Sequence, residues 1–143
     1  MKTILVVDDE EAVLAMVRDV LTLAGHEVLE AGGGAEALEI EQAHAGPIDL
    51  LLTDIVMPGL SGPDLARKFA ARRPRAKLLF MSAFSLVDMA HHTISIDQGV
   101  PILTKPFTLD ALERKVHGLL APSPFARPAA RGQADTTIPK ATR

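Results

Sequence analysis

Short apolar runs and amphipathic segments alternate along the first 120 residues of the chain. The apolar runs lie at 4–7, 26–31, 50–53, 76–83 and 102–104. Those at 4–7 and 50–53 show no alternation of apolar and polar residues, which is typical of strands covered on both faces by helices. The pattern therefore predicts five short strands, most of them buried.

The segments between these runs carry apolar residues at helical spacing. The first helix is predicted after Asp9, ends at Gly25, and should bury Val13, Val17, Val20, Leu21 and Ala24. A second follows the glycines at 32–34, and a third opens at 62–64 with an early proline. A fourth, beginning at 86–90, is expected to be short or irregular because poor helix formers follow it. Thr108 can cap the last helix, whose inner face should hold Leu109, Leu112, Val116 and Leu119.

Five strands that alternate with five helices predict an α/β sandwich with a parallel sheet, because each helix can serve as a right-handed crossover. In the flavodoxin-like (βα)5 arrangement the strand order is 2-1-3-4-5. That order places the first and third strands side by side.

Composition limits the classes of protein. With 143 residues and 48% hydrophobic content the chain fits one globular domain, and the lack of cysteine excludes disulfides and thiol chemistry. The apolar run at 4–7 is too short for a signal peptide core or a membrane span. We therefore expect a cytoplasmic protein that does not insert into membranes.

Charge divides the chain into two parts. Residues 1–120 carry 11 Lys and Arg against 17 Asp and Glu, a net −6, whereas residues 121–143 carry 4 against 1, a net +3. An acidic body argues against nucleic acid as a partner. Proline, alanine and scattered charge dominate the end of the chain, so we expect a domain at 1–121 and a disordered tail at 122–143.

Acidic residues end two of the predicted strands. Asp8 and Asp9 follow the first strand, and Asp54 ends the third before a turn at Pro58 and Gly59. In the 2-1-3-4-5 order these three carboxylates converge and repel one another unless a cation joins them. A hard divalent ion with oxygen ligands, most plausibly Mg²⁺, fits such a site.

Ser82 and Lys105 end the fourth and fifth strands at the same edge of the sheet. They offer a hydroxyl and a fixed positive charge, which are groups that bind phosphoryl oxygens. The residues thus predict that Asp54 attacks a phosphoryl group and becomes an aspartyl phosphate, while Mg²⁺, Ser82 and Lys105 hold the phosphoryl oxygens.

Together these motifs resemble the receiver domain of two-component response regulators, the CheY-like family. The matching residues span 3–120: Asp8-Asp9 after an apolar strand, Asp54 followed by Met57-Pro58-Gly59, Ser82-Ala83, and Lys105-Pro106-Phe107. The resemblance implies Asp54 as phosphoacceptor, Asp8 and Asp9 as metal-site acids, Ser82 as switch hydroxyl and Lys105 as phosphate sensor. It also implies the Val56 backbone carbonyl as a metal ligand and a cis Lys105–Pro106 bond.

The family likeness implies a phosphoacceptor signalling domain and not a turnover enzyme. Its phosphoryl donor would be a sensor histidine kinase or a histidine phosphotransfer protein, and its output a contact with a downstream protein target. The sequence leaves open whether it acts alone, belongs to a hybrid histidine kinase, relays phosphate or forms a homodimer.

The sequence departs from the family pattern in two ways. Ile102 stands where the family often has an aromatic residue that swings inward on activation. Val56 and Phe84, two residues after Asp54 and Ser82, cannot hydrogen-bond a water in line with the phosphorus, which predicts a long-lived acyl phosphate.

Other functions fit less well. A haloacid-dehalogenase-like phosphatase also uses an aspartate after a strand, but it needs a second acid at the position that Val56 occupies. A degenerate receiver that binds partners without phosphorylation would not need the acids, hydroxyl and lysine that are all present.

Three further sequence features could suggest binding sites, but a structural explanation fits each of them better. The glycines at 32–34 lack the Gly-Lys-Ser/Thr ending of a phosphate loop, so we interpret them as a turn. His91 and His92 are expected on the surface and not on a metal, since adjacent helical residues diverge. Basic residues along the third helix and just after it, including Arg72 and Arg73, are interpreted as a solvated face more readily than as a polyanion site.

Overall fold

The computed structural model describes residues 1–83 and 99–121 of the chain. The elements are β1 (Thr3–Val7), α1 (Glu11–Leu23), β2 (Glu27–Ala31), α2 (Gly34–Ala43), β3 (Leu50–Asp54), α3 (Gly62–Arg72), β4 (Lys77–Ser82), β5 (Ile102–Thr104) and α5 (Leu109–Leu120). Several predicted features fall outside the described residues: the fourth helix, Phe84, His91, His92 and the tail at 122–143.

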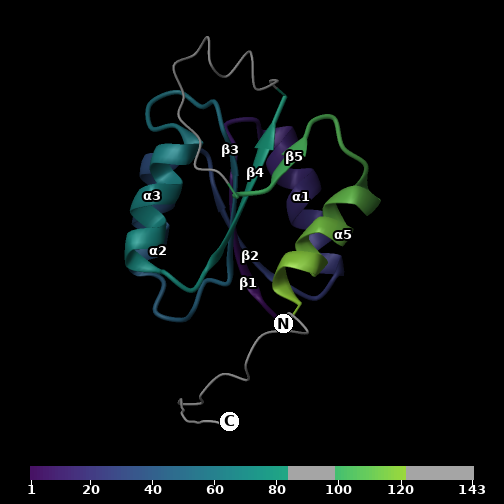
Figure 1. Ribbon diagram of the computed structural model, residues 1–143, viewed down its shortest axis with the longest axis horizontal. Helices are drawn as coiled ribbons and strands as arrows, with labels where there is room; N and C mark the ends of the chain where they lie inside the picture. Colours follow the sequence, from purple (N-terminus) through teal and green to yellow (C-terminus); the bar gives the residue numbers. More distant parts are fainter. Residues whose placement is uncertain (84–98, 122–143) are drawn as a thin grey trace, which may run out of the picture.

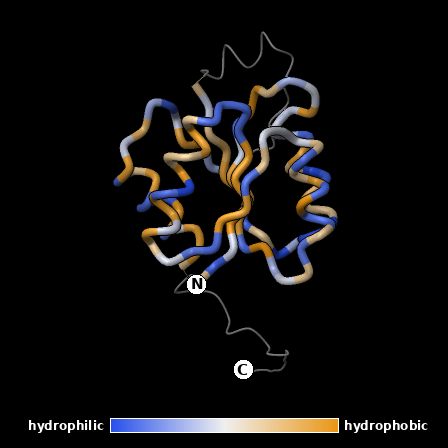
Figure 2. Tube along the Cα trace, turned by 180° about the vertical axis from the view of Figure 1, so that it is seen from behind, coloured by the Kyte–Doolittle hydropathy of each residue, from blue (hydrophilic) through white to orange (hydrophobic). Residues whose placement is uncertain are grey.

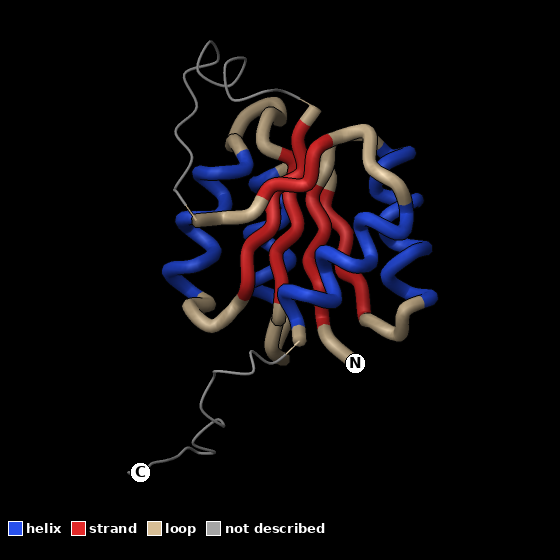
Figure 3. Tube along the Cα trace, turned by 45° about the vertical axis from the view of Figure 1, so that its right-hand side comes forward, coloured by secondary structure: helices blue, strands red, loops and turns tan. Residues whose placement is uncertain are grey.

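A five-stranded sheet with the order β2-β1-β3-β4-β5 forms the middle layer, and every pair of neighbouring strands is parallel. Helices α1 and α5 cover one face and α2 and α3 the other (Figure 1). Figure 3 shows the strands side by side between these two helical layers. The predicted flavodoxin-like α/β fold and its strand order are confirmed.

The sheet separates two hydrophobic clusters, because successive side chains of a strand point to opposite faces. Ile4 and Val6 of β1 pack with Val17 and Leu21 of α1, whereas Leu5 and Val7 pack on the other side. The tube in Figure 2 is mostly hydrophobic along the strands and mixed along the helices. Strands buried on both faces explain why β1 and β3 have continuous apolar sequences.

Capping residues and glycine mark the ends of several helices. The hydroxyl of Ser61 accepts a hydrogen bond from the Asp64 N–H, and that of Thr108 accepts one from Ala111 N–H, so both cap their helices. Gly25 ends α1 with φ of 94°, a conformation that favours glycine. The Lys105–Pro106 bond is cis, as the family resemblance implied.

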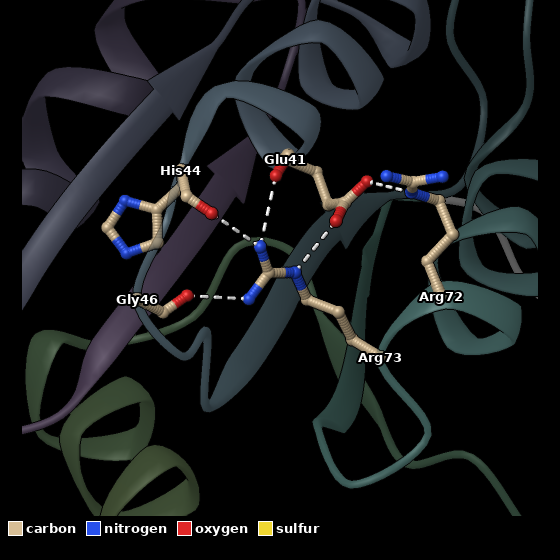
Figure 4. A network of polar contacts seen from close by, with 5 residues as sticks. All are labelled: Glu41, His44, Gly46, Arg72 and Arg73. Carbon is tan, nitrogen blue, oxygen red and sulfur yellow. Dashed lines mark hydrogen bonds and ion pairs between the residues drawn. The ribbon is translucent and has the colours of Figure 1, made fainter.

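Three expectations about burial are wrong. Ala24 is exposed because it caps the end of α1, where the chain leaves the core. Leu109 is 52% exposed because it occupies the first position of α5, before that helix meets the sheet. Arg73 does not belong to a solvated face: it is half-buried, and with Arg72 it binds the buried carboxylate of Glu41 on α2 (Figure 4).

Candidate functional site

Asp54 is the last residue of β3 and lies at the carboxyl edge of the sheet. Its strand runs between β1 and β4, with Thr53 opposite Val7 and Asp54 opposite Met81. The side chain is mostly buried, and its Oδ1 accepts a hydrogen bond of 2.9 Å from the Ile55 N–H. One carboxylate oxygen is thereby fixed, which orients the other.

Asp8 and Asp9 follow β1 at the same edge. Asp8 is fully buried, and its Oδ1 accepts a hydrogen bond from the Glu10 N–H, which holds the turn into α1. One carboxylate oxygen from each of Asp8, Asp9 and Asp54 lies within 4.8 Å of the others. The convergence predicted from the strand order is therefore present in the structure.

Lys105 brings a positive charge into this group of acids. Its Nζ lies 2.8 Å from Oδ2 of Asp8 and 3.5 Å from Oδ2 of Asp54. Glu10, which the sequence did not single out, is the third acid near it, at 3.6 Å. The signal for Glu10 is its position directly after the Asp8-Asp9 pair.

Burial and charge act in opposite directions on the ionisation of Asp54. Burial disfavours its charged form and raises its pKa to about 6, the positive charge of Lys105 opposes this change, and the negative charge of Asp8 adds to it. Asp54 is consequently ionised for the most part at neutral pH. Burial also disfavours the charged form of Lys105, but the hydrogen bond to Asp8 and the charge of Asp54 outweigh it, so the pKa of Lys105 is raised.

Ser82 and Val56 lie close to Asp54 in the chain or the sheet. Ser82 ends β4, is buried, and accepts a backbone hydrogen bond of 2.8 Å from the Lys105 N–H, which ties the ends of β4 and β5 together. Val56 is half-buried in the turn that follows Asp54, and Gly59 in the same turn has φ of 77°. Phe84, the other residue expected beside the line of attack, lies outside the described residues.

A pocket of about 330 Å³ opens next to Lys105 between α1 and the turn after β5. It is lined by Val13, Met16, Ala83, Lys105, Pro106 and Phe107. Apart from Lys105, the residues that line it are apolar and bring no ionisable group. The chemistry of this edge therefore resides in the acids beside the pocket.

The donor atoms suit a hard cation. Three clustered carboxylates, of which Asp9 is exposed to solvent, offer oxygen ligands and an accessible side where waters can complete an octahedron, as Mg²⁺ prefers. Repulsion among the three acids would favour a bound cation beside Lys105, which already contacts Asp8 and Asp54.

Comparison with known proteins decides the family. The model of the response regulator receiver domain matches residues 4–117. This chain belongs to that family. As a receiver domain it takes part in two-component signal transduction. No helix in the described part of the chain has the length and hydropathy needed to cross a membrane.

Two relatives in Brucella abortus place receivers of this kind in different proteins. The chain is 36% identical to the sensor kinase CckA over 118 residues, 82% of this chain and 12% of CckA. It is 34% identical to the response regulator receiver protein CpdR over 124 residues, 84% of this chain and 98% of CpdR. The receiver thus corresponds to a small part of one relative and nearly the whole of the other.

A solved structure bears on the metal. The response regulator protein TrrA from Thermotoga maritima, in complex with Mg²⁺-BeF, superposes on this receiver with a TM-score of 0.68 at 34% identity, covering 84% of this chain and all of TrrA.

Proposed function

We propose that this receiver accepts a phosphoryl group on Asp54 from a phosphohistidine of a histidine kinase or a histidine phosphotransfer protein. The observation that carries the proposal is the position of Asp54: its carboxylate belongs to a cluster of three acids and lies 3.5 Å from the ammonium group of Lys105. A nucleophile, a cation site and a fixed positive charge thus meet at one point.

The transfer exchanges one bond to phosphorus for another. A carboxylate oxygen of Asp54 forms the new P–O bond while the P–N bond to the histidine breaks. The electron pair of the broken bond stays on the imidazole nitrogen, which takes up a proton. Lys105 and Ser82 then hold phosphoryl oxygens, with the ammonium group offsetting their negative charge.

The groups that would hold Mg²⁺ are the carboxylates of Asp8, Asp9 and Asp54 and the backbone carbonyl of Val56. When bound, the ion supplies positive charge that neutralises the acids and the phosphoryl oxygens. Weak binding is expected, in the sub-millimolar to millimolar range, because the chain provides few ligands and waters must complete the octahedron. The complex of TrrA with Mg²⁺-BeF supports this assignment.

The proposed role is that of a signalling domain that passes on its phosphorylated state through protein contacts in the cytoplasm. The only reactions that we propose for it are its own phosphorylation and dephosphorylation. Similarity to CpdR, of which the chain covers 98%, supports a response regulator made of a receiver alone. Similarity to the sensor kinase CckA, and to the solved receiver domain of a hybrid histidine kinase of that name, supports the second candidate, the receiver of a hybrid kinase.

The proposal is tested by phosphate uptake. Wild type and Asp54→Asn are incubated with acetyl phosphate and Mg²⁺, and intact mass spectrometry follows the addition of one phosphoryl group. Asn keeps the volume of the side chain but lacks the nucleophilic oxygen, so only wild type should gain mass. Equal uptake by the variant would show that Asp54 is not the acceptor.

A further inference from the structure

The loop at 55–61, which joins β3 to α3, passes close to two glycines. Gly62 opens α3 at one end of the loop, and Gly34 opens α2 beside it. The loop contains Val56, whose carbonyl is a proposed metal ligand, and it begins directly after Asp54. Any displacement of this loop is therefore expected to move groups of the phosphorylation site.

Gly62 meets the backbone that follows the phosphoacceptor. A Cβ at this position would lie 2.9 Å from Cα of Ile55 and 3.0 Å from the carbonyl carbon of Asp54, and closer still to the Asp54 carbonyl oxygen. The Gly62 N–H also donates a 2.8 Å hydrogen bond to the carbonyl of Ile55. Because these neighbours are backbone atoms, no change of side-chain rotamer can make room for a methyl group.

Gly34 meets the other side of the loop. Its Cβ would lie 2.8 Å from Cβ and 2.9 Å from Cδ2 of Leu60. Leu60 is half-buried and packs against the hydrophobic cluster that α2, α3 and the sheet share. Because the nearest atom is its Cβ, a change of side-chain rotamer alone cannot relieve the contact. The first turn of α2 therefore limits how far the loop can move away from β3.

Backbone conformation does not explain why glycine occupies positions 34 and 62. The glycines of the described chain with positive φ are Gly25, Gly59 and Gly99. Gly34 and Gly62, the first residues of α2 and α3, are not among them, so neither needs glycine to reach its φ angle. What requires glycine at both positions is the close approach of another part of the chain.

We propose that Gly62 and Gly34 are positioning residues for the phosphorylation site, which together fix the loop at 55–61 and hence Asp54 and the Val56 carbonyl. This inference rests on the proposed function of Asp54. To reach ordinary contact distance from the Asp54 backbone, a methyl group at Gly62 must displace the chain by about 1 Å. A shift of that size can cost about a hundredfold in rate when it misplaces a reacting group.

The first test uses Gly62→Ala with Ser61→Ala as its matched control. Ser61→Ala removes the cap of α3 and costs stability of about 1 kcal/mol, yet it adds no atom next to Asp54. In metal-free protein, Gly62→Ala should shift the amide NMR signals of Ile55 and Val56, and Ser61→Ala should leave them near their wild-type positions. Gly62→Ala should also weaken Mg²⁺ binding about tenfold and slow phosphorylation by acetyl phosphate ten- to a hundredfold. Equal effects of both variants would overturn the assignment, because loss of stability alone would then explain them.

The second test remains available if Gly62→Ala fails to fold. Gly34→Ala should weaken Mg²⁺ binding and slow phosphorylation several-fold. Adding Leu60→Ala should restore both in part, because it removes Cγ and Cδ2 of Leu60, two of the three atoms that the new methyl group meets, and leaves only Cβ in the way. Leu60→Ala alone serves as the control for the lost apolar side chain. A Gly34→Ala variant with unchanged Mg²⁺ binding, or a double variant with no recovery, would contradict the proposal.

The proposed function of Asp54 and the positioning role of the two glycines can fail separately. If wild type takes up no phosphoryl group in these assays, the proposed function of Asp54 is wrong. If wild type is phosphorylated and the glycine variants behave like it, only the positioning role is wrong.

Discussion

The ammonium group of Lys105 lies 2.8 Å from a carboxylate oxygen of Asp8, and Asp8 is fully buried. This pair joins the end of β5 to the end of β1 across the acidic edge of the sheet. Breaking a buried ion pair leaves an uncompensated charge, which is more costly than losing an exposed pair.

Replacing Lys105 should therefore cost stability that Mg²⁺ can restore. Lys105→Met keeps the length of the side chain and removes its charge, and we expect a loss of about 3 kcal/mol in metal-free protein, the low end for a buried pair, because Lys105 is partly exposed. A divalent cation among the same acids should recover part of this loss. Urea unfolding with and without Mg²⁺ measures both numbers. An identical loss in both conditions would show that Lys105 and the metal do not share the acids.

Asp54 should make the metal-free protein less stable as pH rises. Burial raises its pKa in the folded state to about 6 from an ordinary value of 3.8, so the folded state binds the proton more tightly than the unfolded state does. The stabilising contribution of the proton is complete below pH 4 and is lost as pH rises to about 6.

Asp54→Asn removes this dependence. At pH 7 the variant should melt a few degrees higher than wild type. This corresponds to a gain in the free energy of unfolding on the order of 1 kcal/mol, because solvent screens the charge of Asp54 at the partly exposed edge of the sheet. At pH 4 the two proteins should melt alike. Melting curves in chelator at both pH values test this. A variant that is less stable at pH 7 would mean that Lys105 compensates Asp54 fully.

Glu41 and Arg73 connect α2 to the end of α3 (Figure 4). Nε of Arg73 donates to Oε2 of Glu41. Its other nitrogens donate to the carbonyl of Glu41, in the last turn of α2, and to those of His44 and Gly46, which follow the helix. Burial of the Glu41 carboxyl opposes its ionisation, but hydrogen bonds from Arg73 and Arg72 outweigh burial and lower its pKa.

We expect Glu41→Gln to cost about 2 kcal/mol near neutral pH, since charged hydrogen bonds are lost in a buried place. Because the pKa is depressed in the folded state, this contribution is present above the ordinary pKa of the group and disappears as pH falls through the lowered value. The control is Arg114→Ala, which breaks an exposed ion pair with Asp110 and should cost less than about 0.5 kcal/mol. Equal losses in urea unfolding would contradict the difference between buried and exposed pairs.

The lifetime of the phosphorylated protein is a separate prediction. Val56 offers no hydrogen bond to a water approaching the phosphorus, and neither does Phe84 by its chemistry. Val56→Asn together with Phe84→Glu should shorten the lifetime ten- to a hundredfold, or by about 1.4–2.7 kcal/mol of barrier. Decay of the phosphoprotein after removal of acetyl phosphate gives the rate. Wild type that decays within seconds, or a double variant that decays no faster, would show that other groups control the water.

The sequence predicts much of the site because its residues follow strands. The convergence of Asp8, Asp9, Asp54 and Lys105 follows from strand order, and parallel strands bring their carboxyl ends to one edge. The close approaches of Gly34 and Gly62 could not be predicted, since they depend on where helices pack and not on local conformation. The ion pairs of Glu41 were missed for the same reason: charged residues on two helix surfaces give no sign of meeting until the helices are placed side by side.

The central claim is that Asp54 carries the phosphoryl group, and chemical mapping of the modified residue tests it most directly. Borohydride reduces an acyl phosphate to an alcohol, so a phosphorylated aspartate appears as homoserine in peptide mass spectra. After incubation with acetyl phosphate and Mg²⁺, homoserine should replace Asp54 and neither Asp8 nor Asp9. Homoserine at Asp8 or Asp9, or phosphorylated protein without homoserine at Asp54, would contradict the account.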